Sequence, residues 1–220
     1  MTTGKKKAGE LGAGQRIIID LTSKGVGAFP FTEGSRDSAL YVTLINGNYT
    51  LHISSADQNK PAQGIAVGEV YLVTDSVNLR NGLLTNMSAR SKTGTGQNQL
   101  ILGFVTAGTR PTRLLIRGIG PSLAAFGVEG LLADPVLIVR NNKGEILNPA
   151  GAFVPNDATT STNNDWGDAR TVIDEGYKVG AFPLISDSKD AAVVVTVPPG
   201  SYTATIAGVG GTTGVALVEV

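Results

Sequence analysis

The chain has no cysteine among its 220 residues, a single histidine, and aromatic residues make up only 5%. The absence of cysteine excludes disulfide bonds and thiolate metal sites. One histidine, His52, leaves little for acid–base catalysis near neutral pH, where histidine is the usual proton carrier. An excess of one charge is also missing, because 18 Lys and Arg residues balance 18 Asp and Glu residues. Neither nucleic acid nor an anionic membrane surface is therefore an expected partner.

Long apolar runs are missing as well. No segment reaches the roughly 20 apolar residues that a membrane-spanning helix needs, so no membrane span is expected. Residues 1–14 contain Lys5-Lys6-Lys7 without an apolar stretch after them, unlike a secretory signal peptide. We expect these residues to form a flexible tail. Either the protein stays inside the cell, or a signal peptide has already been removed.

Strand-forming residues dominate what is present. The apolar segments are rich in Val, Ile and Thr, and 29 glycines and 10 prolines punctuate them. Helical patterns are scarce: Ser122 and Asp168 predict caps for short helical turns at Leu123–Phe126 and Ala169–Glu175, the second stopped by Gly176. The sequence therefore predicts an all-β fold of β-sandwich or jelly-roll lobes.

An internal repeat is the most informative feature of the chain. Residues 26–55 align without a gap with residues 179–208, and 14 of the 30 positions are identical. Residues 64–70 then match residues 214–220 after a three-residue difference in length. The period of about 150 residues predicts tandem modules rather than a solenoid of short repeats. Besides the shared Val-Gly-Ala-Phe-Pro, the identities are Ser35, Asp37, Ala39, Val42, Thr43, Gly47, Tyr49, Thr50 and Ile53, which match Ser188, Asp190, Ala192, Val195, Thr196, Gly200, Tyr202, Thr203 and Ile206.

The repeat divides the chain into two tandem lobes. Residues 15–75 predict an N-terminal half-repeat, whose strands are Gln15–Leu21, Ala39–Ile45, Tyr49–Ile53 and Ile65–Val73. Residues 76–220 predict a complete β module, with its first strands in residues 76–120 and a sandwich lobe in residues 134–220. Its strand patterns are Leu83–Arg90, Gln99–Val105, Thr112–Arg117, Val136–Arg140, Glu145–Leu147, Ala191–Val197, Tyr202–Ile206 and Val215–Val220. The half-repeat has open strand edges, to be completed by residues 77–118 of the same chain or by a neighbouring subunit.

A series of short motifs supports a resemblance to a known family. The series includes Thr-Gly-Thr-Gly at 93–96, Arg-Gly-Ile-Gly-Pro-Ser-Leu at 117–123, Asn-Asp-Trp at 164–166 and Thr-Gly-Val-Ala-Leu-Val-Glu-Val at 213–220. Residues 77–220 resemble a repeat module in the C-terminal regions of large secreted proteins of environmental bacteria. Residues 134–220 also resemble the bacterial pre-peptidase C-terminal domain, a β-sandwich appended to secreted enzymes. The resemblance implies an extracellular or cell-surface protein with a structural or accessory role.

The loop of residues 156–168 holds the densest group of oxygen ligands. Calcium takes six to eight oxygens, and the candidate ligands are Asp157, Asn163, Asp165 and Asp168. The spacing differs from that of an EF-hand, because the glycine comes late and no glutamate closes the loop. The favoured interpretation is a metal-free loop, in which Asn and Asp bond turn backbones and Trp166 packs inward. No other cofactor is expected.

Three other candidate sites have structural interpretations. His52 lies on the outward side of a predicted strand, and its repeat counterpart is Thr205, so it is not expected to be a catalytic base. Residues 117–123 lack the third glycine of a dinucleotide-binding loop and contain Pro121, which predicts a structural turn. Asp37 and Asp190 are expected to cap turns at strand starts. The sequence therefore predicts a protein that is not an enzyme.

The expected function is that of an extracellular structural module that self-associates, head to tail, into a fibre or surface array. Contacts of this kind that do not close into rings generate filaments. The expected assembly interface is the apolar strand of the half-repeat, with Ile17, Ile18, Ile19 and Leu21. The alternative is an accessory module that binds carbohydrate or another cell-surface polymer, stacking sugars on Trp166 with Tyr177 or Tyr202. The expected partners are thus copies of the chain, or such a polymer.

Overall fold

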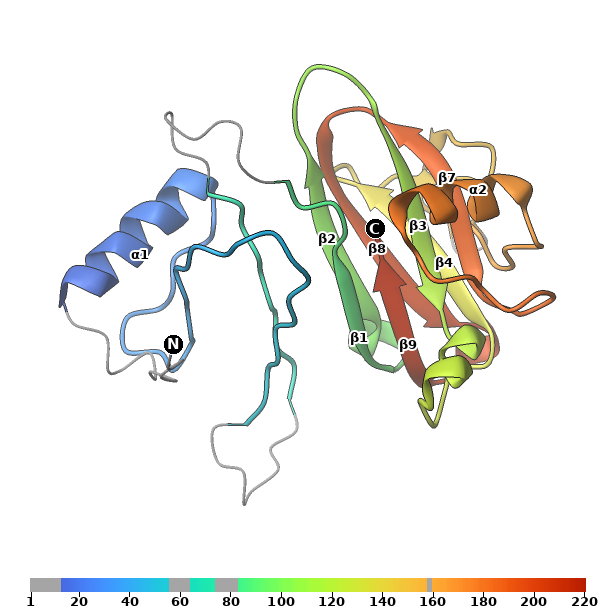
Figure 1. Cartoon of the computed structure of the whole chain (residues 1–220), viewed down its shortest axis with the longest axis horizontal. Helices are drawn as coiled ribbons and strands as arrows, with labels where there is room; N and C mark the ends of the chain where they lie inside the picture. Colours follow the sequence, from blue (N-terminus) through green and yellow to red (C-terminus); the bar gives the residue numbers. More distant parts are fainter. Residues whose placement is uncertain (1–12, 56–63, 74–82, 158–159) are drawn as a thin grey trace. The chain divides into compact units, whose positions relative to one another are not determined.

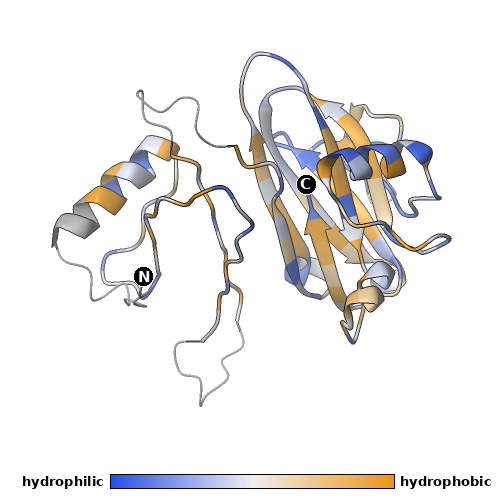
Figure 2. Cartoon of the chain, viewed as in Figure 1, coloured by the Kyte–Doolittle hydropathy of each residue, from blue (hydrophilic) through white to orange (hydrophobic). Residues whose placement is uncertain are grey.

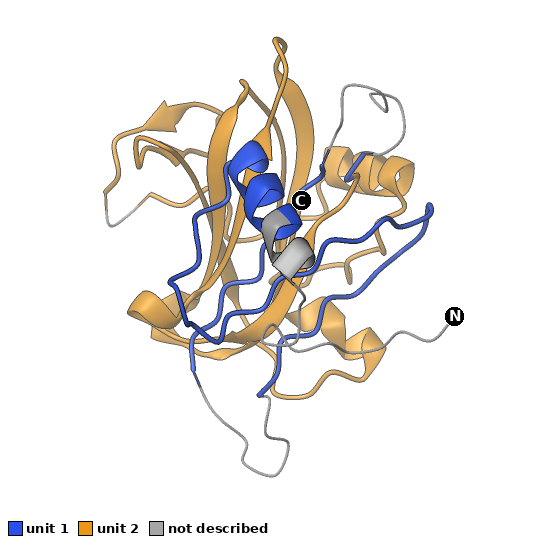
Figure 3. Cartoon of the chain, turned by 90° about the vertical axis from the view of Figure 1, so that its left-hand side faces the viewer, with its two compact units in different colours: residues 1–84 blue, residues 85–220 orange. Residues whose placement is uncertain are grey.

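The computed structural model describes residues 13–55, 64–73, 83–157 and 160–220. The chain divides into two compact units, unit 1 (residues 1–84) and unit 2 (residues 85–220), and each is described by itself (Figure 3). Most of the expected tail lies outside the described residues, and its last two residues, Ala13 and Gly14, begin a helix. Among the helices of the described residues, none has the length and apolar character needed to cross a membrane.

Unit 2 consists of two antiparallel sheets packed face to face (Figure 1). One sheet has the strand order β1-β9-β3-β7 and the other the order β2-β8-β4-β5-β6. The strands are β1 Ser88–Thr93, β2 Leu100–Thr106, β3 Thr112–Ile119, β4 Pro135–Asn141, β5 Ile146–Leu147, β6 Phe153–Val154, β7 Ala191–Val197, β8 Gly200–Gly208 and β9 Gly214–Glu219. The prediction of an all-β fold is confirmed for this unit.

The two ends of unit 2 are interleaved in the sheets. β1 pairs with β9, β2 with β8, and β3 with both β7 and β9, while β8 lies between β2 and β4. Described residues from the segment 77–118 thus form β1, β2 and most of β3 of unit 2. The pairings thus assign this segment to unit 2, and they give no support to the alternative in which it completes the N-terminal half-repeat.

The core of unit 2 lies between the sheets. Along β2 the alternation of buried and exposed residues points Leu100, Leu102 and Phe104 inward, as period-two patterning requires. They meet Ile116, Val195, Val197, Ala204, Ile206 and Val218 from the other strands. On the outer face of the four-stranded sheet, the helix α2 (Arg170–Val179) covers a smaller cluster of Trp166, Val172 and Ala192.

The helical segments of unit 2 correct two expectations. The 3-10 turns are η2 (Gly96–Asn98), η3 (Pro121–Phe126) and η4 (Val209–Gly211). Asp168 does not cap α2, because its backbone is left-handed (φ 51°) and its carboxylate bonds Ser186 and Asp187 instead. Gly176 does not stop α2; it is buried near Leu115 within the helix, and the helix ends at Gly180 with φ 72°.

Unit 1 begins with the helix α1 (Ala13–Val26), so the prediction of a strand at Gln15–Leu21 is wrong. Ile18 and Leu21 are three positions apart, a spacing that places both on one helix face. Lys24 and Asp20 form an i,i+4 ion pair at 2.8 Å. Gly27, with φ 77°, ends the helix: Ala28 N donates to Ser23 O, and Gly27 N donates to Lys24 O. The local sequence therefore contains a glycine C-cap and an ion pair that both favour a helix. Together they overcome the strand preference of the short β-branched run.

The remaining described residues of unit 1, 27–55 and 64–73, are extended but form no ladder of hydrogen bonds among themselves. The predicted strands Ala39–Ile45, Tyr49–Ile53 and Ile65–Val73 are therefore not paired, and a tandem second sandwich is not formed. Figure 2 shows apolar residues along these extended segments. Leu51 and Ile53 lie against Gly68, but two or three short strands without a further sheet to cover them are at best marginally stable in water.

Candidate functional site

A buried carboxylate joins distant parts of unit 2. Asp190, at the start of β7, accepts hydrogen bonds from Gly120 N at 2.8 Å, from Ser122 N at 3.2 Å and from Ser188 Oγ at 2.6 Å. The Ser122 hydroxyl also donates to it. We call Gly120, Ser122, Ser188 and Asp190 the Asp190 clasp. The expected local cap at the strand start is therefore not what forms: Asp190 bonds the amides of a turn that follows β3 and lies about 70 residues away in the sequence.

The Asp190 clasp indicates that residues 117–123 form a structural turn and not a phosphate-binding loop. The amides that a dinucleotide loop offers to a phosphate are bonded here to the protein's own carboxylate, so the predicted structural turn is confirmed. The Ser122 hydroxyl is doubly used, because it also accepts a hydrogen bond from Ile185 N at 2.7 Å. A buried serine–aspartate pair of this kind has no histidine to activate it as a nucleophile. Its role is to hold the β3 turn against β7.

Arg117 makes a second tie between the same regions. Its Nε donates to Glu219 Oε1 at 2.9 Å, and its Nη1 donates to the carbonyl oxygen of Phe182 at 2.5 Å. The guanidinium carbon lies 4.4 Å from the centre of the Phe182 ring, a cation–π distance. Because the arginine is buried, these contacts satisfy a charge that is otherwise costly to desolvate.

Trp166 anchors the Asn- and Asp-rich loop as predicted. The indole is buried and packs against Val172 and Ala192. Its Nε1 donates to Ser188 Oγ at 3.1 Å, and its backbone nitrogen donates to Asp190 O at 2.8 Å. The loop is thereby attached directly to the Asp190 clasp. The sequence signal that pointed to these residues is the Ser-x-Asp spacing, which recurs at Ser35 and Asp37.

The four candidate calcium ligands are engaged in different places. Asp157 bonds the amide and hydroxyl of Thr160, and Asn163 Oδ1 accepts from Ala192 N at 2.8 Å. Asp165 pairs with Lys189 at 3.1 Å, and Asp168 bonds Ser186 and Asp187. Asp165 and Asp168 line one hollow of about 230 Å³ together with Lys189; Asp157 and Asn163 do not line it. Within the described residues, no group of three or more His, Cys, Asp or Glu is placed to hold a metal ion.

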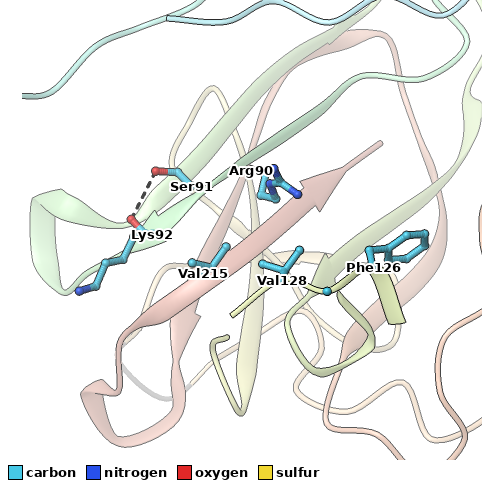
Figure 4. A pocket seen from close by; sticks show the side chains of 7 residues that line it. Arg90, Ser91, Lys92, Phe126, Val128 and Val215 are labelled. Carbon is cyan, nitrogen blue, oxygen red and sulfur yellow. Dashed lines mark hydrogen bonds between the residues drawn. The ribbon is translucent and has the colours of Figure 1, made fainter. Parts of the chain in front are cut away.

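A larger hollow, of about 490 Å³, lies beside β1 and the end of η3 (Figure 4). Arg90, Lys92, Phe126, Val128 and Val215 line it. Its lining offers two cations and apolar side chains, but no acid, and Ser91 Oγ faces the backbone at 3.4 Å from Lys92 O.

The expected sugar-stacking platform is not available. Trp166 and Tyr202 are both buried, and Tyr202 is stacked between Phe104 and Phe153 at centroid distances of 5.5 and 5.7 Å. Burial raises the pKa of the Tyr202 phenol above its ordinary value of 10.0. Tyr177, on α2, is exposed, and neither Trp166 nor Tyr202 is at the surface to form a platform with it. The prediction that Trp166 pairs with Tyr177 or Tyr202 as a sugar platform is therefore wrong, because the indole is part of the core.

The expected assembly residues lie in unit 1. Ile17, Ile18, Ile19 and Leu21 belong to α1 rather than to a strand; the side chains of Ile18 and Leu21 are exposed, and that of Ile17 is outside the description. His52 is exposed in an extended segment. Glu69 lies beside Tyr71, and the pKa of Tyr71 is raised by burial and by the charge and hydrogen bond of Glu69.

The apolar residues of the extended segments of unit 1 are open to solvent. Val42, Leu44, Tyr49, Leu51 and Ile53 are between 50% and 62% exposed. Their repeat counterparts in unit 2 are all core residues, at most 7% exposed: Val195, Val197, Tyr202, Ala204 and Ile206. One apolar pattern is thus buried in one unit and uncovered in the other. This uncovered set is the strongest candidate for a functional surface.

Comparison of the chain with known proteins gave no match to a family model, to a curated protein or to a solved structure.

Proposed function

We propose that this chain is a non-enzymatic structural module of an extracellular or cell-surface assembly, and that unit 1 joins it to other polypeptides, including copies of itself. The observation that carries the proposal is the uncovered apolar set of unit 1. Contiguous exposed apolar surface on a protein commonly marks an interaction site. The extracellular setting rests on the resemblance of residues 77–220 to modules of secreted proteins.

The kind of contact follows from the backbone. Residues 39–45, 49–53 and 64–70 form no ladder of hydrogen bonds among themselves, and segments of this kind are suited to main-chain pairing with strands from another chain. The exposed side chains Ile18 and Leu21 of α1 add apolar surface to the proposed interface. A contact between unit 1 of one copy and unit 2 of the next is head to tail, a geometry that extends into fibres or arrays when it does not close into a ring.

Sedimentation velocity and electron microscopy over a range of concentrations test the proposal. The full chain should form concentration-dependent assemblies, and the double variant Leu44→Glu, Leu51→Glu should need at least about tenfold more protein to do so, because two carboxylates must be desolvated. Thr43→Glu is the control: it is the neighbour of Leu44, and its counterpart Thr196 is exposed in unit 2. A full chain that remains monomeric at every concentration contradicts self-association.

A further inference from the structure

Unit 1 retains the local geometry of the last part of unit 2. Tyr49 Oη donates to Ile45 O at 2.7 Å, and Tyr202 Oη donates to Pro198 O at 2.7 Å, in each case four residues earlier. Each ring also lies against the glycine of the turn, Gly47 in one copy and Gly200 in the other. The turn sequences differ, Asn-Gly against Pro-Gly, yet the same hydrogen bond forms. In unit 1, the turn between the segments equivalent to β7 and β8 is therefore already formed.

The strands that pair with β7, β8 and β9 in unit 2 have no equivalent in unit 1. β7, β8 and β9 are paired there with β1, β2, β3 and β4, all supplied by residues 88–141. Unit 1 has counterparts of β7, β8 and β9 at residues 39–45, 49–53 and 64–70. Among the described residues of unit 1, no counterpart of β1 to β4 is found. Unit 1 thus corresponds to the second half of a module whose first half comes from elsewhere.

The polar residues that hold the two halves of unit 2 together recur in unit 1. In unit 2, Asp190 and Ser188 bond the Gly120–Ser122 turn and Trp166, while Glu219 and Phe182 bond Arg117. The four residues on the second-half side have identical counterparts, all of them exposed: Phe29, Ser35, Asp37 and Glu69. Asp37 and Glu69 offer exposed carboxylate acceptors, and Glu69 also takes part in a hydrogen bond with Tyr71. They match the donors of a first half.

On this basis, and resting on the proposed function of unit 1 as an interaction surface, we propose the identity of its partner. Unit 1 binds a polypeptide segment of the kind formed by residues 85–178, with an Arg-Gly-x-Gly-Pro-Ser turn and an Asn-Asp-Trp loop. That segment supplies the missing strands and completes unit 1 as a second sandwich. Asp37 accepts the amides of its turn, and Glu69 pairs with its arginine.

A count of halves distinguishes this partner from a second copy of the chain. Each chain carries one first half, residues 85–178, and two second halves, residues 26–73 and 179–220. When the first half of one copy pairs with unit 1 of another copy, it leaves the second half of its own unit 2 without a partner. Each such exchange therefore completes one second half and exposes another. Copies of this chain alone therefore cannot complete every unit 1. The segment that does so belongs to a further repeat module outside these 220 residues.

The test is an insertion of a second copy of residues 85–178 between Gly25 and Val26 of the full chain. Val26 then follows Lys178 as Val179 does in the parent. Hydrogen exchange is measured on residues 39–53, which occur once in the inserted chain. They should exchange at least about tenfold more slowly than in the parent chain, because ladder hydrogen bonds protect amides. Exchange at the parent rate, with residues 191–208 still protected, overturns the proposal.

A second chain decides the result if residues 191–208 also lose protection, which would mean that the inserted chain misfolds. In this chain, residues 179–220 of the parent are replaced by a second copy of residues 26–73. Trp166, the single tryptophan, reports on the sandwich by its fluorescence. A cooperative thermal transition with a buried indole supports the proposal, and the loss of that transition overturns it.

The role of the clasp is tested inside the inserted chain. Asp37→Ala should raise the exchange rate of residues 39–53, whereas Glu33→Ala, an exposed neighbour whose counterpart is Ser186, should not. Equal effects of the two variants overturn recognition through Asp37. The outcome is separate from that of the self-association test. Protection of residues 39–53 in the inserted chain, together with a monomeric parent chain, supports the proposed partner and contradicts self-assembly. No protection in the inserted chain, together with assemblies of the parent chain, supports self-assembly and contradicts the proposed partner.

Discussion

Arg117 and Glu219 stand directly opposite each other on the neighbouring strands β3 and β9, and their ion pair is nearly closed to solvent. Arg117 Nη2 lies 2.7 Å from Glu219 Oε1, and the two side chains are 2% and 8% exposed. A pair this deeply buried costs desolvation energy, so its contribution to stability depends on both charges being present. It links the first half of the sandwich to its last strand.

Removal of one charge should therefore be more harmful than removal of both. We expect Glu219→Ala to lower the free energy of unfolding of unit 2 by about 3–5 kcal/mol, because the arginine is left buried and unpaired. The double variant Arg117→Met, Glu219→Leu should lose less. Urea unfolding followed by Trp166 fluorescence measures both. Glu69→Ala, the equivalent change in unit 1, serves as the control and should leave this transition unchanged. Equal losses in the single and double variants would contradict the coupling.

The Asp190 clasp should be among the most sensitive positions in unit 2. Asp190→Ala removes the acceptor of two buried amides and two hydroxyls, and we expect a loss of at least about 3 kcal/mol. Ser188→Ala should cost about 1–2 kcal/mol, since it removes single hydrogen bonds to Asp190 and Trp166. Ser186→Ala, two residues earlier and exposed, is the control. Thermal unfolding ranks the three, and a Ser186 variant as unstable as the Asp190 variant would refute the clasp.

Tyr202 should make unit 2 sensitive to alkali. Burial raises the pKa of the phenol in the folded state above 10.0, so folding favours the neutral form. The stability that this provides is complete below about pH 10, the ordinary pKa of tyrosine, and is lost as the pH rises through the higher folded pKa. Tyr202→Phe should cost about 1 kcal/mol at neutral pH, through the hydrogen bond to Pro198, and should flatten the alkaline loss. Melting curves across the alkaline range test this, with the exposed Tyr177→Phe as control; an unchanged alkaline slope in Tyr202→Phe would rule it out.

The loop of residues 156–168 should keep its stability without calcium. Asp165 is paired with Lys189, and Asn163 bonds the backbone of Ala192, so both already have protein partners. We expect chelator to leave the melting temperature within about a degree, and added calcium to leave it equally unchanged, because only an ion that binds the folded chain shifts its unfolding equilibrium. A melting temperature several degrees lower in chelator would instead establish a metal site. Asp168→Asn then identifies whether the hollow beside Lys189 holds it.

Local patterns predicted the strands of unit 2 well and its long-range ties poorly. The short apolar run Ala191–Val197 is found as β7 with the predicted bounds, because a run of this length that is rich in β-branched residues and ends at a Pro-Gly turn is typical of a buried strand. The bond between Asp190 and Gly120 had no local signal, since it joins residues 70 positions apart. The run at Gln15–Leu21 misled, because its β-branched residues favour a strand while the Gly27 stop and the Asp20–Lys24 pair favour a helix. In unit 1 the sequence correctly predicted the turn that precedes Tyr49, but not the state of the segments on either side of it. A strand also needs partners, and sequence propensity does not reveal whether they are present.

The interleaving of first and last strands in unit 2 has a consequence for biosynthesis. β1, β2 and β3 emerge from the ribosome long before β7, β8 and β9, with which they pair. Contacts of high sequence separation form slowly, and until then the edges of the early strands are open to other chains. Unit 1, which emerges first, carries strands of the same type as these awaited partners. During synthesis it is thus a competitor for the strands that unit 2 needs, and the order of translation places it within reach of them.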